Sequence, residues 1–178
     1  MAAVGSRGRT TRTIQVGERA GAEFPVVAPS HVSAIATFAG GGVAQSLLSF
    51  DSPLARMGII EITGTEGTLV VPDPNFFGGV VRITRPVTMA TIAEDPVWTT
   101  LPAPEATWGR GAGVLDLARC IRGGGTPVAS GALGYHVLDT MVAMQESLAG
   151  GQTVAVTSSI APVPLLPEGW DPYEATLG

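Results

Sequence analysis

The sequence predicts an α+β fold, an open and mostly antiparallel β-sheet of about six or seven strands with two C-terminal helices packed on one face. Two observations indicate this class. Apolar and polar residues alternate in short segments through the first two thirds of the chain, which is the period of a half-buried strand. From Gly113 onward the apolar residues recur every three or four positions, as in a helix. The uncovered face of such a sheet meets solvent or serves as a binding surface.

The first third of the chain predicts a strand, a loop and a hairpin. Met1–Ser6 are small residues that we expect to fray, and the alternation in Thr11–Glu18 predicts the first strand. Arg19–Pro29 contains glycine and proline and is typical of a loop. Ser30–Phe38 alternates cleanly and is followed by a second apolar run, Val43–Phe50, so we expect these two segments to pair.

The three glycines 40–42 between those segments raise the alternative of a phosphate-binding loop. Such a loop has the spacing G-x-G-x-x-G and lies between a strand and a helix. Here a strand follows and the spacing differs, so the sequence favours a hairpin turn.

The clearest hairpin is GIIEITGTEGTLVVPDP, residues 58–74. Isoleucines at positions 59, 60 and 62 are followed by the turn Gly64–Gly67, and Thr68–Val71 resumes the strand pattern until Pro72. A further strand is expected over Val80–Arg85, and a short edge strand over Trp98–Leu101.

Two helices end the predicted domain. The first has apolar residues at 114, 117, 118 and 121 and ends at the glycines 123–125. The second begins at the N-cap Ser130, carries an apolar stripe and ends at Gly150-Gly151. A short strand is expected over Thr153–Thr157. We therefore expect a single domain over residues 1–160 and an extended proline-rich tail over residues 161–178.

Composition excludes several functions. The net charge is −5, all ten basic residues are arginines that are scattered along the chain, and there is no lysine, which argues against nucleic acid and excludes Schiff-base chemistry. The single cysteine, Cys120, excludes an internal disulfide. No apolar run is long enough to cross a membrane, and the N-terminus does not resemble a secretory signal, so we expect a cytoplasmic protein.

Four segments resemble one enzyme family. EITGTEGTL, the hairpin SHVSAIATFAGGGVAQSLLSFDSP, the helical region from WGRGAGVLDLARC to the run ASGALGYHVLDTM, and the tail PVPLLPEGWDPYEATLG are similar in order and spacing to the C-terminal domain of the Gfo/Idh/MocA oxidoreductases. The resemblance covers nearly everything from His31 onward. It implies an open-sheet domain that helps to close a substrate pocket and often builds the oligomer.

In that family a separate N-terminal Rossmann domain binds NAD or NADP through a G-x-G-x-x-G/A turn. This chain has no such turn between a strand and a helix and, without lysine, cannot contain the family's Glu-Lys-Pro motif. The family's junction helix with its Asp and His is expected upstream of this chain. We therefore predict no catalytic residue, no cofactor-binding residue and no metal ligand here, and we expect the chain to bind no cofactor alone.

Three residues are candidates for substrate binding. Trp108 and Arg110 lie in a glycine-rich loop before the first helix, where an indole can stack on a sugar and a guanidinium can grip a carboxylate or hydroxyl groups. The alternative is a solvated Arg110, or one paired with Asp116. His136 matches a histidine of the family's closing helix, although a satisfied helix-face histidine is the commoner case. The two histidines, His31 and His136, have no aspartate or glutamate at the spacing of zinc ligands, which argues against a zinc site. The neighbouring carboxylates Glu94 and Asp95 lie in a predicted loop, where adjacent side chains point apart, so we expect them to be solvated.

These observations favour the C-terminal substrate-binding and oligomerisation domain of an NAD(P)-dependent oxidoreductase that acts on a sugar or cyclic polyol, inactive alone. Its partners would be a missing or separate Rossmann domain and further copies of the chain, joined through the open sheet face. The alternative is a stand-alone binding or dimerisation module that docks to a separate dinucleotide-binding protein. A truncated gene product is a third possibility.

Overall fold

The structure is a computed structural model that describes residues 1–53, 60–86, 95–102, 109–166 and 169–174. The chain divides into two compact units, Met1–Pro53 with Val128–Leu166, and Leu54–Pro127 with Pro167–Gly178. Each unit is described by itself. The described residues form nine strands in three antiparallel sheets and two helices, which confirms the α+β class.

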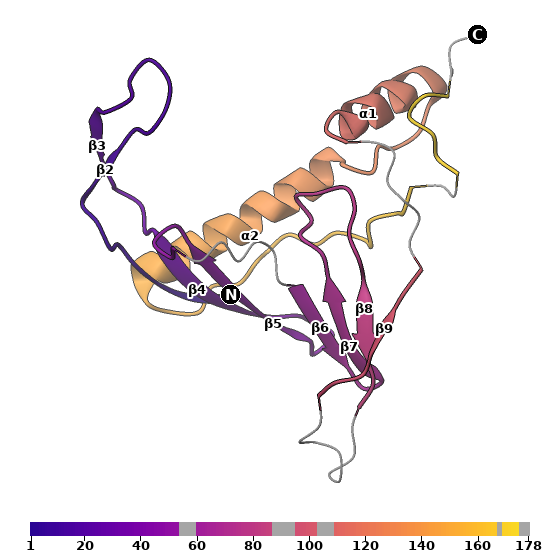
Figure 1. Ribbon diagram of the computed structural model, residues 1–178, viewed down its shortest axis with the longest axis horizontal. Helices are drawn as coiled ribbons and strands as arrows, with labels where there is room; N and C mark the ends of the chain where they lie inside the picture. The colour runs from indigo at the N-terminus through magenta and orange to yellow at the C-terminus, as the bar shows by residue number, and fades with distance from the viewer. Residues whose placement is uncertain (54–59, 87–94, 103–108, 167–168, 175–178) are drawn as a thin grey trace. The chain divides into compact units, whose positions relative to one another are not determined.

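The main sheet of unit 1 has the order β1-β4-β5, formed by Ala2–Ser6, His31–Thr37 and Val43–Ser49. The middle strand, β4, pairs with β5 along its whole length, from His31 with Ser49 to Thr37 with Val43. This pairing confirms the predicted hairpin. A second, two-stranded sheet joins β2, Thr11–Thr13, to β3, Glu23–Pro25. Figure 1 shows it as a hairpin that projects from the main sheet. We call residues 11–27 the arm.

Two predictions for this region were wrong. Ala2–Ser6 does not fray, because it pairs along its whole length with β4, from Ala2 with Ile35 to Ser6 with His31. The expected strand over Thr11–Glu18 is shorter, since only Thr11–Thr13 pairs, and its partner β3 lies in the expected loop. Backbone pairing created both strands, β1 through β4 and β3 through its hairpin with β2, and small or proline-containing segments carry little local pattern from which to predict it.

The second helix, α2, spans Gly131–Gly150 with the predicted caps. The Ser130 hydroxyl accepts from the Leu133 N–H at 3.2 Å, and Gly151, at a φ of 64°, ends the helix in the left-handed conformation that suits glycine. The segment after α2 is extended but forms no assigned strand, so the prediction for Thr153–Thr157 was wrong. Val154 nevertheless exchanges two backbone hydrogen bonds with Met1, at 2.8 and 2.9 Å.

Ser147 joins α2 to the main sheet. Its side chain is almost fully buried, accepts from the Ala3 N–H at 2.9 Å and donates to the Gln152 carbonyl at 2.7 Å. Ala3 and Ala143 are also buried. Small side chains on both elements let β1 and the last turns of α2 approach closely, and one hydroxyl satisfies a backbone group on each side of the contact.

The opposite face of α2 is apolar and exposed. An α-helix turns by 100° per residue, so the five apolar residues of this face, named below, point away from Ala143 and Ser147. They are exposed by between 40% and 62%: Tyr135, Val137, Leu138, Met141 and Val142. These five large apolar residues therefore face away from the buried contact, whereas Leu133, Met144 and Leu148 of the same helix are half-buried and Leu148 lies against Gly5 of β1.

Unit 2 contains a four-stranded antiparallel sheet in chain order. Its strands are β6, Ile60–Gly64; β7, Gly67–Val71; β8, Arg82–Thr84; and β9, Trp98–Thr100. The predicted hairpin of β6 and β7 is confirmed, with Gly64 opposite Gly67. A Cβ atom at Gly67 would overlap the Thr84 carbonyl oxygen, so glycine is required there. Helix α1, Ala112–Gly123, follows where the sequence predicts a helix.

Replacing the buried hydroxyl should destabilise unit 1. In Ser147→Ala the Ala3 N–H and the Gln152 carbonyl both lose their partner, which we expect to cost about 1–3 kcal/mol of unfolding free energy. Urea denaturation measures this change, and hydrogen exchange at the Ala3 amide should accelerate. Ser46→Ala, at an exposed position of β5, is the matched control. Equal stability of the two variants would contradict the assigned role.

Candidate functional site

Arg110 lies in the loop that precedes α1 and is held by a side chain from a distant turn. Its Nη2 donates to Asn75 Oδ1 at 2.7 Å. Asn75 is itself placed by Asp73, whose Oδ1 accepts from the Asn75 N–H at 2.8 Å. The sequence left Arg110 either solvated or paired with Asp116, and in the described contacts its partner is Asn75. The pair joins the turn after β7 to the start of α1 within unit 2.

Two aromatic residues follow Asn75 in the same turn. Phe76 is 62% exposed and Phe77 40% exposed. Arg110 is exposed, and a guanidinium has five N–H donors, of which the bond to Asn75 uses one. Such a surface can offer donors to hydroxyl or carboxylate oxygens and aromatic faces to apolar C–H groups. The other residue predicted for this loop, Trp108, lies outside the described residues.

His136 lies on α2 in unit 1 and contacts the extended segment after that helix. Its Nδ1 is 2.7 Å from Ser158 Oγ. One turn along, Asp139 Oδ2 accepts from the backbone N–H groups of Ser158, at 2.8 Å, and Thr157, at 3.1 Å. The spacing of three residues puts His136 and Asp139 on one side of the helix.

These contacts lower the pKa of the Asp139 carboxyl. The largest cause is the hydrogen bond from the Ser158 side chain, followed by those from the Ser158 and Thr157 backbone. In the described contacts the carboxylate binds the serine rather than the imidazole, so it does not orient His136 as a general base. The pair holds residues 157–158 against α2.

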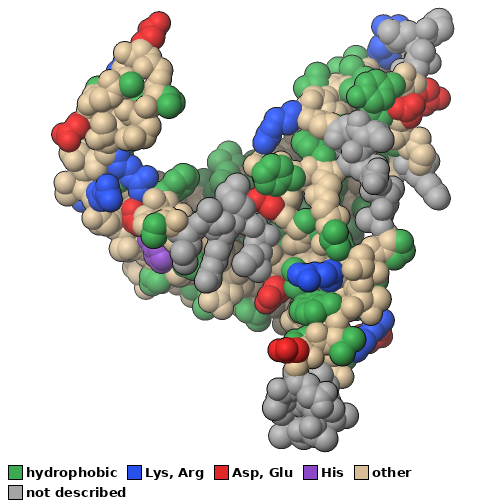
Figure 2. All heavy atoms as spheres, viewed as in Figure 1, with side chains coloured by type: hydrophobic (Ala, Val, Ile, Leu, Met, Phe, Trp, Pro, Cys, Tyr) green, Lys and Arg blue, Asp and Glu red, His purple; other side chains and the backbone are tan. Residues whose placement is uncertain are grey.

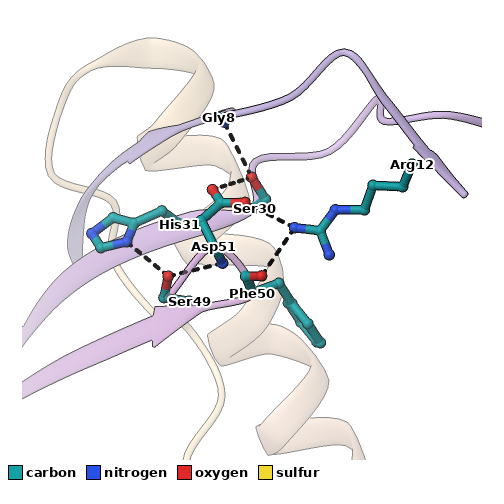
Figure 3. Close-up of polar contacts among 7 residues, drawn as sticks. All are labelled: Gly8, Arg12, Ser30, His31, Ser49, Phe50 and Asp51. Carbon is teal, nitrogen blue, oxygen red and sulfur yellow. Dashed lines mark hydrogen bonds and ion pairs between the residues drawn. The ribbon is translucent and has the colours of Figure 1, made fainter. Parts of the chain in front are cut away.

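A third polar cluster, which sequence reasoning missed, lies at the base of the arm (Figure 3). Asp51 follows β5 and accepts from the Ser30 hydroxyl at 2.6 Å and from Arg12 Nη2 at 2.8 Å. Ser30 Oγ in turn accepts from the Gly8 N–H at 3.4 Å. One carboxylate thus joins the chain before β4, the end of β5 and the first strand of the arm.

Neighbouring groups complete this cluster. Arg12 Nη2 also donates to the Phe50 carbonyl at 3.1 Å, and its guanidinium lies 5.9 Å from the centre of the Phe50 ring. Ser49 Oγ accepts from the Asp51 N–H at 3.2 Å and lies 3.1 Å from His31 Nδ1. The hydrogen bond from Ser30 lowers the pKa of Asp51 against the opposing effect of burial, and Arg12 lowers it further.

The described residues contain no group of three or more histidine, cysteine, aspartate or glutamate side chains placed to hold a metal ion. Among the residues that the structure describes, neither helix is both long enough and apolar enough to cross a bilayer.

No protein-family model and no curated protein sequence matches this chain. Solved structures do match. A levoglucosan dehydrogenase in complex with NADH and L-sorbose has 24% identity and a TM-score of 0.64, over 88% of this chain and 45% of that chain. Its apo form matches with 23% identity and a TM-score of 0.61, over 86% of this chain and 46% of that chain.

An oxidoreductase domain protein from Kribbella flavida has 20% identity and a TM-score of 0.59, over 85% of this chain and 44% of that chain. At these identities the matches show a shared fold. This chain spans less than half the length of the solved chains that it resembles. It therefore has the fold of part of an oxidoreductase chain.

The Asp51 cluster should open in acid. Because the folded pKa of Asp51 is lowered, its carboxylate stabilises the arm above the unfolded value of about 3.9, and this stabilisation is lost as the pH falls through the lower folded pKa. NMR resonances of Gly8 and Arg12 should move together in a transition below pH 4. Asp51→Asn should abolish that transition, whereas Asp95→Asn, at an exposed position, should keep it. An unchanged transition in Asp51→Asn would exclude this carboxylate as its origin.

Removing the Asp139 carboxylate should release the segment after α2. Asp139→Ala deletes the acceptor for two backbone N–H groups, so amide exchange at Thr157 and Ser158 should become at least several-fold faster. Glu146→Ala, on the exposed side of the same helix, should leave both amides unchanged. Equal protection in the two variants would show that the segment is held by other contacts.

Proposed function

We propose that this chain is the substrate-binding and oligomerisation half of an NAD(P)-dependent oxidoreductase of the Gfo/Idh/MocA type that acts on a sugar or cyclic polyol. The observation that carries the proposal is the fold shared with less than half of a levoglucosan dehydrogenase chain whose structure holds NADH and L-sorbose. The sequence resemblance from His31 onward points to the same kind of enzyme.

Under this proposal the chain is inactive alone. It has no lysine and no G-x-G-x-x-G turn, so it lacks the family's Glu-Lys-Pro motif and dinucleotide fingerprint. The dinucleotide, NAD or NADP, is bound by a Rossmann domain on the same or another chain, in the cytoplasm.

Arg110 and Trp108 are the residues to which we assign sugar binding. The hydrogen bond that Arg110 donates to Asn75 restrains the Arg110 side chain, so less conformational entropy is lost when a ligand binds. We also assign a role in sugar binding to His136. Its Nε2 is the ring nitrogen that would contact the sugar, because Nδ1 already contacts Ser158.

The exposed area supports a role in assembly. Among the described residues, large apolar side chains of unit 1 lie at the surface, for example Val4, which is 71% exposed, Val43, which is 68% exposed, and Leu47, which is 65% exposed. A chain that leaves this much surface uncovered has partners to cover it. We propose further copies, joined through the open face of the β1-β4-β5 sheet, and the Rossmann domain.

The same observation favours a second candidate, a stand-alone module that docks to a separate dinucleotide-binding protein. This module, like the oligomerisation half, is expected to cover its open sheet face, so a chain that stays monomeric at high concentration in sedimentation counts against both candidates.

Sugar binding can be tested by titrating the labelled chain with levoglucosan or L-sorbose and recording amide and indole NMR shifts. We expect the Arg110 amide and the Trp108 indole to move, and Arg110→Ala to weaken binding about tenfold, as expected for a lost hydrogen bond to a charged group. Arg122→Ala, at the other end of α1, is the matched control. Equal binding by both variants would remove Arg110 from the site.

The cofactor assignment has its own readout. The chain alone should produce no NADH from NAD and levoglucosan, and its tryptophan fluorescence should show no saturable change with NADH. Turnover by this chain alone would overturn the proposal.

A further inference from the structure

The side chain of Ser158 lies between an imidazole and a carboxylate. Its Oγ is 2.7 Å from His136 Nδ1, and it also forms a hydrogen bond with the Asp139 carboxylate. The three residues belong to unit 1, and all three are half-buried. The hydroxyl of Ser158 therefore connects the carboxylate to a ring that the carboxylate does not itself contact in the described residues.

The Asp139 carboxylate is held in place by the main chain. Its Oδ2 accepts from the Ser158 N–H at 2.8 Å and from the Thr157 N–H at 3.1 Å. These contacts and the Ser158 hydroxyl lower the pKa of the carboxyl group, so Asp139 is ionised at neutral pH. An ionised carboxylate has no proton to donate and can only accept hydrogen bonds.

The direction of the two side-chain hydrogen bonds follows from the number of protons. A serine hydroxyl has one proton and can accept through its lone pairs. If Ser158 gave that proton to His136, its lone pairs would face the Asp139 carboxylate, and no proton would lie between the two oxygens. A hydrogen bond to a carboxylate is also about twice as strong as one between neutral groups. The hydroxyl of Ser158 therefore donates to Asp139.

This direction decides which nitrogen of His136 carries the proton. Because Ser158 Oγ meets the ring with a lone pair, the 2.7 Å contact requires Nδ1–H as the donor. A neutral imidazole has one ring N–H, so Nε2 is left with a lone pair. In the part of the chain that the structure describes, no hydrogen bond uses Nε2.

We propose that Asp139 and Ser158 are positioning residues, which keep the proton of neutral His136 on Nδ1 so that Nε2 accepts a hydrogen bond from a sugar hydroxyl. The inference rests on the sugar binding proposed above. Asp139 acts on the ring through Ser158, and the role of His136 is binding rather than proton abstraction.

This arrangement makes His136 selective for one chemical group. The lone pair on Nε2 attracts a hydroxyl that donates a proton, whereas a carbonyl or ether oxygen offers only lone pairs and is not bound. A polar group that is placed to bind a hydroxyl discriminates strongly against an analogue without that hydroxyl. His136 would therefore select ligands with a free hydroxyl at this position.

His31 provides an internal reference. The chain has two histidines, and little of the face in view in Figure 2 has the purple colour of histidine. His31 Nδ1 also contacts a serine, with Ser49 Oγ at 3.1 Å, but Ser49 accepts from the Asp51 N–H, and in the described contacts no carboxylate takes its proton. Substitutions at Asp139 or Ser158 should leave the ring of His31 unchanged.

Nitrogen NMR of the imidazole rings tests the tautomer directly. In mildly alkaline solution, long-range correlations between ring protons and ¹⁵N nuclei should show the proton of His136 on Nδ1. Asp139→Asn and Ser158→Ala should each lower the ratio of this tautomer to the other about fivefold, as expected for a lost hydrogen bond. Ser158→Thr, which keeps a hydroxyl, should retain the ratio, and Ser159→Ala, at an exposed position, is the matched control.

Unchanged His31 signals verify that each variant is folded. A proton on Nε2 of His136 in the unsubstituted chain would overturn the inference. A tautomer ratio that stays the same in both Ser158→Ala and Asp139→Asn would also overturn it, since the two side chains would then not set the position of the proton.

A titration with levoglucosan tests the acceptor role. We expect the Nε2 resonance of His136 to move toward that of a protonated nitrogen, while Nδ1 stays unchanged. Fully O-methylated levoglucosan has no hydroxyl proton and should leave Nε2 unchanged, so an equal shift with this compound would overturn the acceptor role. An unchanged Nε2 beside a shifted Arg110 amide would overturn it as well but leave the proposed function intact. No response from either residue would overturn the proposed sugar binding and the acceptor role together.

Discussion

The main sheet of unit 1 depends on one buried hydroxyl group. Ser147 Oγ joins the second residue of β1 to the C-terminal end of α2, across 144 positions of sequence, and then to the turn that follows the helix. Because β1 pairs with β4, and β4 with β5, this link sets where α2 lies on the sheet. The small side chains around it allow the close approach, and a larger residue at Ala3 or Ala143 would separate the two elements.

The sequence predicted those elements whose signals are local. Alternation predicted β4 and β5, turn glycines predicted the hairpin of β6 and β7, and the caps of α2 at Ser130 and Gly151 are where the residue types indicated. It failed where a distant partner decides the conformation. Ala2–Ser6 has no strand pattern of its own and becomes β1 only because β4 offers an unpaired edge. The apolar residues of α2 were predictable, but which of them would be exposed was not, since Ser147 sets the direction of the helix through a partner far away in sequence.

For the candidate sites, too, the sequence indicated the residues with local signals and missed the contacts with distant partners. The glycine-rich loop identified Arg110, yet its partner Asn75 lies 35 residues earlier in a turn with no motif. The Asp51 cluster gathers Gly8, Arg12 and Ser30 from three segments and gave no signal in the sequence. His136 and Asp139 are spaced to share one side of a helix, a pattern that could have indicated their common role at Ser158. Under the proposed function, the reaction chemistry would belong to the Rossmann domain, and this chain would contribute shape and contacts.

The exposed apolar face of α2 affects how this chain can evolve. Positions such as Leu138, Met141 and Val142 count as surface in the isolated chain, where folding alone places little constraint on them. In an assembly that covers this face, the same positions belong to a packed interior. Substitutions there would then be neutral for folding yet selected through the partner. Drift on this face would follow the partner's sequence, while the inner face, with Ala143 and Ser147, would stay constrained by the fold.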